Sequence, residues 1–90
     1  MYDIKLSHNA VKVYKKLQAK DLKKIDHALS IIEKNPIYFP GKIIQLTGKL
    51  YGKYRYKIGD WRIIYTVDKD NEEVNVEAIA LRSSNTYRRN

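Results

Sequence analysis

The stretch GKYRYKIGDWRIIY, residues 52–65, decides the fold. Apolar and polar residues alternate on both sides of Gly59-Asp60, which is typical of two antiparallel strands joined by a tight turn. Because glycine stands first in this dipeptide, the sequence favours a two-residue type II′ turn. We therefore predict a β-hairpin over these residues.

The turn also determines which residues lie opposite each other, and directly opposed residues share a face of the sheet. One face then carries the aromatic and aliphatic members Tyr54, Tyr56, Ile58, Trp61, Ile63 and Tyr65. The other face carries Arg55, Lys57 and Arg62, with Lys57 directly across from Arg62. A shift of one residue would scramble this division, so the alternation and the turn support the same register.

Like charges directly opposite each other destabilise a sheet, and a bound anion reverses the sign of this effect. Two or three cations on a rigid face can hold a phosphate and stabilise charge that develops on it. The alternative is a solvated polar face on which Lys and Arg are incidental. We expect Arg62 to be exposed, so that its truncation costs no more than about 0.5 kcal/mol of stability.

The residues before the hairpin predict a strand and two helices. Residues 2–6 alternate as a strand, and Ser7 follows as an N-cap. The first helix has an apolar stripe formed by Ala10, Val13, Tyr14 and Leu17. The second helix begins at Asp21 as its N-cap and ends at Asn35-Pro36, because the residue before a proline is disfavoured in the α conformation.

The remaining segments complete a single domain over residues 1–90. Residues 36–53 form a connection with a brief extended stretch near 43–46, residues 68–73 form a polar loop, and residues 74–80 alternate as the last strand. The element order is β-α-α-β-β-β. This order predicts an α+β fold in which a two-helix hairpin packs on a small antiparallel sheet.

Charge is the most informative feature of the composition. The 90 residues carry a net charge of +8, concentrated in residues 42–65 and 82–90. Such a surface attracts polyanions, of which nucleic acid is the commonest in cytosol, although a lysine-coated surface also accounts for the helical lysines. The absence of cysteine, of a signal-peptide pattern and of a long apolar run favours a cytoplasmic protein without a membrane partner.

Residues that bind metals or cofactors are few. His8 and His27 are isolated, and the acidic loop of residues 68–73 lacks the glycine and terminal glutamate of an EF-hand. Ser83-Ser84 has no adjacent base that could activate a nucleophile. We expect neither a metal nor a small-molecule cofactor.

The hairpin resembles the RelE/ParE superfamily of bacterial and archaeal toxins from toxin–antitoxin pairs, and within it the RelE-like ribonuclease branch. Residues 52–65 follow the family pattern of tyrosine, basic, hydrophobic, basic, a turn, aromatic-arginine, aliphatics and tyrosine. The upstream LTGKL of residues 46–50, Asn35-Pro36 and the element order also fit. Leu81 departs from the pattern, because many relatives have histidine there, and the spacing from Arg82 to Tyr87 varies among relatives.

The resemblance implies the toxin component of a type II toxin–antitoxin system, restrained by a cognate antitoxin. It implies a metal-independent endoribonuclease that cleaves mRNA in the ribosomal A site. The catalytic residues that it implies are Arg55, Lys57, Arg62, Arg82 and Tyr87. Neighbouring basic residues are candidates for RNA binding: Lys49, Lys53, Arg88 and Arg89.

RNA supplies its own nucleophile, the 2′-hydroxyl, so a catalyst must deprotonate it, neutralise the reacting phosphate and protonate the leaving oxygen. Two other functions compete with this one: a ParE-like non-enzymatic inhibitor of DNA gyrase, and a non-catalytic RNA-binding domain. The implied set of basic residues and tyrosine favours the ribonuclease, because a gyrase inhibitor has no need of a clustered phosphate-binding face.

Overall fold

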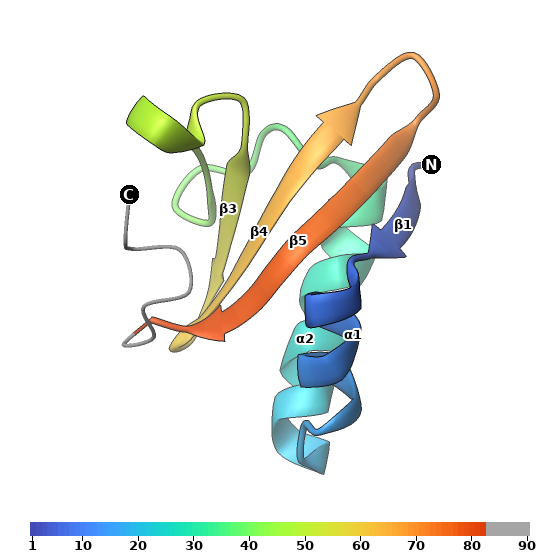
Figure 1. The fold of residues 1–90 in the computed structure, drawn as a ribbon, viewed down its shortest axis with the longest axis vertical. Helices are drawn as coiled ribbons and strands as arrows, with labels where there is room; N and C mark the ends of the chain where they lie inside the picture. The colour runs from blue at the N-terminus through green and yellow to red at the C-terminus, as the bar shows by residue number, and fades with distance from the viewer. Residues whose placement is uncertain (83–90) are drawn as a thin grey trace.

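The structure, a computed structural model, describes residues 1–82 of the chain. Within these residues the elements follow the order β1 (Asp3–Leu6), α1 (His8–Lys15), α2 (Ala19–Lys34), β2 (Ile43–Gln45), the short 3-10 helix η1 (Gly48–Leu50), β3 (Tyr54–Ile58), β4 (Trp61–Asp68) and β5 (Glu73–Leu81). Figure 1 shows both α-helices on one side of the strands and η1 on the other. This arrangement is the α+β fold with a two-helix hairpin that the sequence predicts.

The five strands form one sheet in the order β1-β5-β4-β3-β2. The pairs from β2 to β5 are antiparallel, but β1 lies parallel to β5. The sheet is therefore mixed, and the expectation of a wholly antiparallel sheet was wrong in this detail. Parallel neighbours require a long crossover, which the helices and the hairpin between β1 and β5 provide. The brief extended stretch in the connection is confirmed as β2, an edge strand.

The predicted hairpin register is confirmed in all of its five pairs, including Tyr56 with Ile63 and Lys57 with Arg62. Gly59 has a φ of 57°, while Asp60 is not among the residues of positive φ, as a type II′ turn requires. A glycine is needed at this position because L side chains disfavour positive φ. The turn and the alternation therefore do place the three cations of the hairpin on one face.

The helices begin and end at residues with clear physical causes. The Ser7 hydroxyl accepts a hydrogen bond from the Ala10 amide at 3.1 Å, which confirms Ser7 as the N-cap of α1. The start of α2 was predicted too late: its N-cap is Gln18, and Asp21 lies in the first turn, where its charge suits the helix dipole. The helix ends at Lys34, as the following Asn35-Pro36 predicts.

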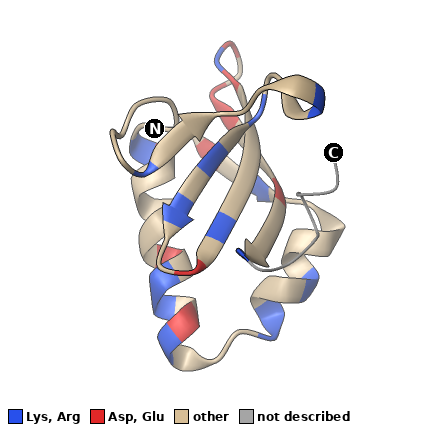
Figure 2. Ribbon diagram, turned by 90° about the vertical axis from the view of Figure 1, so that its left-hand side faces the viewer, with Lys and Arg blue, Asp and Glu red and all other residues tan. Residues whose placement is uncertain are grey.

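The core lies between the helices and one face of the sheet. Ile25, Ala28 and Ile32 of α2 are fully buried and belong to the same cluster as Tyr56, Ile63 and Tyr65. The Tyr65 hydroxyl donates to the Pro36 carbonyl at 2.7 Å, and burial raises the pKa of this tyrosine. Figure 2 shows the opposite face of the sheet in front of the helices. The apolar half of the hairpin thus anchors the sheet, and the basic half faces away from the core.

Candidate functional site

The three cations of the hairpin lie together on the sheet face that the helices leave open; we call Arg55, Lys57 and Arg62 the basic face. Lys57 pairs with Arg62 across β3 and β4, and Arg55 pairs with Ile64 one step along the same face. Their neighbours in sequence, such as Tyr56 and Ile63, belong to the core on the other side. Figure 2 shows the Lys and Arg segments of β3 and β4 close together on the sheet.

Arg62 is only 8% exposed, so the prediction of an exposed side chain was wrong. It lies on β4, between Lys57 of β3 and Ala80 of β5. Its Nη1 donates to the carbonyls of Gly59 at 2.9 Å and Trp61 at 2.8 Å. These two hydrogen bonds hold the guanidinium against the hairpin turn. Arg62 therefore stabilises the hairpin turn.

Arg55 has an unusual polar environment. Its side chain is partly buried, and its Nε is a buried nitrogen that has no hydrogen-bond partner among the described residues. A buried donor without a partner costs free energy, of the order of 1–3 kcal/mol, which a bound acceptor recovers. Lys57, by contrast, is exposed and able to contact a ligand directly.

Lys53 forms an ion pair with Glu77, whereas the sequence predicts it as an RNA-binding residue. Glu77 is the extra residue of β5 at the register shift opposite Ile64 and Tyr65, which is a β-bulge. The pair spans β4, since Lys53 precedes β3 and Glu77 belongs to β5. Sequence reasoning missed Glu77, because a bulge in the middle of an alternating strand has no clear local signature. Lys49 is exposed on η1.

Arg82 follows β5 directly and lies beside the hairpin turn. Its backbone amide donates to the Asp60 carbonyl at 2.7 Å, and its side chain is exposed. The structure thus brings Arg82 to the end of the sheet at which Lys57 and Arg62 lie. Tyr87, Arg88 and Arg89 lie outside the described residues.

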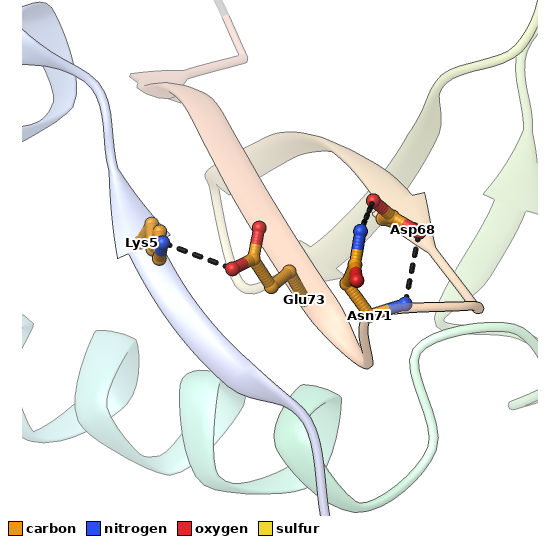
Figure 3. Close-up of polar contacts among 4 residues, drawn as sticks. All are labelled: Lys5, Asp68, Asn71 and Glu73. Carbon is orange, nitrogen blue, oxygen red and sulfur yellow. Dashed lines mark hydrogen bonds and ion pairs between the residues drawn. The ribbon is translucent and has the colours of Figure 1, made fainter.

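Four acidic residues lie in or beside the β4–β5 loop, at the other end of the hairpin strands: Asp68, Asp70, Glu72 and Glu73. Figure 3 shows the Lys5–Glu73 ion pair, at 2.9 Å, and the loop in which Asn71 donates to both carboxylate oxygens of Asp68, from its side chain at 2.8 Å and its backbone at 3.1 Å. These hydrogen bonds lower the pKa of Asp68. Residues 1–82 contain no group of three His, Asp or Glu side chains placed to hold a metal ion. The loop is therefore a structured turn, and the basic face lies apart from it.

Comparison with known proteins identifies the class. A family model described as the ParE toxin of the type II toxin–antitoxin system, parDE, matches residues 4–86. The match covers most of the chain, so the chain belongs to this family of toxins. The resemblance of the hairpin to the RelE/ParE superfamily is thereby confirmed. No curated protein sequence matches the chain significantly.

Solved structures agree with this family. The archaeal RelE–RelB complex from Pyrococcus horikoshii OT3 is 25% identical, with a TM-score of 0.75 over 90% of this chain and 94% of that chain. The YoeB–YefM complex from Staphylococcus aureus is 28% identical, with a TM-score of 0.73 over 88% and 94%. The isolated E. coli RelE toxin, at 19% identity, has a TM-score of 0.74 over 90% and 84%, and shares the fold. In residues 1–82, no helix is long and apolar enough to cross a membrane.

Proposed function

We propose that this toxin is an endoribonuclease that cleaves mRNA in the ribosomal A site, in the cytoplasm, without a metal or small-molecule cofactor. The observation that carries the proposal is the basic face, where Arg55, Lys57 and Arg62 lie together on one rigid sheet. An RNA phosphate is the anion that fits such a cluster, since guanidinium groups bind phosphate oxygens with directed hydrogen bonds.

In the proposed reaction the 2′-oxygen forms a bond to phosphorus while the bond from phosphorus to the 5′-oxygen breaks. Arg55 and Arg62 stabilise the charge on the phosphate, while Nη1 of Arg62 also holds the carbonyls of Gly59 and Trp61. Lys57 or Tyr87 takes the proton of the 2′-hydroxyl, and Arg82 stabilises the leaving 5′-oxygen until this oxygen takes a proton from water.

A cognate antitoxin is the proposed protein partner. The archaeal RelE and the S. aureus YoeB of the comparison were solved with RelB and YefM, respectively. An antitoxin with acidic side chains suits a chain with a net charge of +8, because complementary charge speeds association. It would block the toxin by covering the basic face or displacing the C-terminal segment.

Primer extension on cellular mRNA after brief induction tests the proposal. We expect cuts within translated messages for the wild type and none for Lys57→Ala, whose side chain is exposed and contributes little to folding. Lys69→Ala is the matched control, because Lys69 is also exposed but lies in the loop at the other end of β4. Uncut messages in cells whose growth stops would contradict the proposal.

The alternative is a non-enzymatic inhibitor of DNA gyrase, and the description of the matching family as the ParE toxin favours it. A supercoiling assay with purified gyrase distinguishes the two. The proposed ribonuclease leaves gyrase active at concentrations that cut RNA on ribosomes. A gyrase inhibitor blocks supercoiling and leaves the messages intact.

A further inference from the structure

The loop between β2 and β3 displays an aromatic side chain that the proposed reaction does not use. Tyr51 is 77% exposed, more than any other large hydrophobic residue within residues 1–82. Lys49, two residues earlier on η1, is exposed as well. An exposed tyrosine next to a lysine is the combination with which proteins bind single-stranded nucleic acid, since the ring stacks on a base and the cation contacts a phosphate.

The loop holds Tyr51 in a defined place. The Tyr51 amide donates to the Gly48 carbonyl at 3.1 Å, and the Lys53 amide donates to the Leu50 carbonyl at 3.1 Å. Gly48 and Gly52, on either side, have φ values of 66° and 93°, which other residues rarely adopt. The tyrosine is therefore carried by a closed and hydrogen-bonded loop.

This loop lies at the rim of the basic face. Figure 1 shows η1 projecting from the side of the sheet opposite to the helices, which is the side of the basic face. Tyr51 precedes Arg55 by four residues, so their Cα atoms lie no more than about 14 Å apart. A strand whose phosphate contacts Arg55 can thus reach the tyrosine with a nearby base.

We propose that Tyr51 stacks on an unpaired nucleobase of the RNA bound to the basic face, while Lys49 contacts the adjoining phosphate. This inference rests on the proposed function and adds to it a base-binding subsite. A base that is held by Tyr51 determines which phosphate of the RNA lies beside Arg55. The subsite therefore contributes to the selection of the phosphodiester bond that is cleaved. Neither the family resemblance nor the basic pattern of the hairpin assigns a role to this tyrosine.

Binding of a short single-stranded 2′-O-methyl RNA, measured by fluorescence anisotropy at low salt, tests the subsite, because this probe has no free 2′-hydroxyl and is not cut. Stacking on one base contributes enough that Tyr51→Ala should weaken binding by about 5- to 100-fold. Tyr51→Trp should bind as well as the wild type. Tyr38→Ala is the matched control, because Tyr38 is similarly exposed, at 73%, in a different loop.

A second set of probes, each lacking one base, identifies the partner of Tyr51. Loss of the stacked base should weaken binding to the wild type and leave binding to Tyr51→Ala unchanged. Equal affinities of Tyr51→Ala and Tyr38→Ala would overturn the subsite, as would full binding by Tyr51→Leu. Failure of the wild type itself to bind the intact probe would instead reject the proposed RNA function, and the subsite with it.

Discussion

At the scale of the residue, the side chain of Arg62 has a structural role in the hairpin turn and a proposed role in binding phosphate. Its Nη1 holds the carbonyls of Gly59 and Trp61, and its place on the basic face makes it a candidate phosphate ligand. A buried guanidinium held in this way is already oriented before RNA arrives, which lowers the entropic cost of binding. Its loss should therefore affect both the fold and the reaction, and the two effects must be measured separately.

We predict that Arg62→Ala lowers the free energy of unfolding by about 1–3 kcal/mol, because two hydrogen bonds of a buried side chain are lost. For a domain of this size the melting temperature then falls by roughly 4–20 °C. Thermal unfolding followed by circular dichroism measures the change. Lys57→Ala, with its exposed side chain, should melt within a few degrees of the wild type and still lose cleavage. An unaltered melting temperature of Arg62→Ala would show that the hydrogen bonds to the turn add nothing.

At the scale of the element, the bulge of β5 places the carboxylate of Glu77 near the basic face. Glu77 pairs with Lys53, and its carbonyl accepts a hydrogen bond from the Ser7 hydroxyl at 2.9 Å, so the bulge is fixed to the start of α1. A carboxylate here repels phosphate and occupies a lysine that would otherwise bind it. The ion pair thus limits the RNA-binding surface on the side of Lys53.

We predict that Glu77→Gln strengthens RNA binding and steepens its salt dependence by about one phosphate contact, because Lys53 becomes available. Glu73→Gln is the matched control, since it breaks the Lys5–Glu73 pair on the same strand at the acidic end (Figure 3). Both pairs are partly exposed, so each substitution should cost at most about 1 kcal/mol of stability. Anisotropy over a range of salt concentrations measures the slopes. Equal slopes for the two variants would mean that Lys53 takes no part in RNA binding.

The same elements show what a sequence can and cannot predict. The hairpin register was predictable because a glycine-first turn and a strict alternation determine it locally. The bulge at Glu77 and the parallel pairing of β1 with β5 depend on residues distant in the chain: Ser7 contacts Glu77 across 70 positions. The burial of Arg62 and its two hydrogen bonds to the turn are features of the folded hairpin, and the alternation of β4 alone does not reveal them.

At the scale of the whole molecule, the net charge of +8 predicts how RNA and antitoxin compete. Free toxin should bind RNA with an affinity that falls steeply as salt rises, because counterions are released from the RNA. The purified complex with its antitoxin should bind the same RNA poorly, since the acidic partner neutralises or covers the basic face. Anisotropy titrations of both forms make the comparison. Undiminished RNA binding by the complex would rule out direct occlusion.

The last prediction concerns the reaction itself, in which the proposed nucleophile belongs to the RNA. The 2′-hydroxyl is adjacent to the phosphate that it attacks, so the toxin needs to supply only charge stabilisation and proton transfer. Cleavage should leave a 2′,3′-cyclic or 3′-phosphate and a 5′-hydroxyl, and it should survive chelation of divalent ions as long as the ribosome stays intact.

Replacing the single ribose on the 5′ side of the cut by 2′-deoxyribose should abolish cleavage and leave binding nearly unchanged, because the phosphate that contacts Arg55, Lys57 and Arg62 is still present. Mass spectrometry of the products and anisotropy of the same substrate separate the two effects. A cut at comparable rate in the deoxy substrate would require water or a protein side chain as the nucleophile. The basic face would then act on a different reaction from the one proposed.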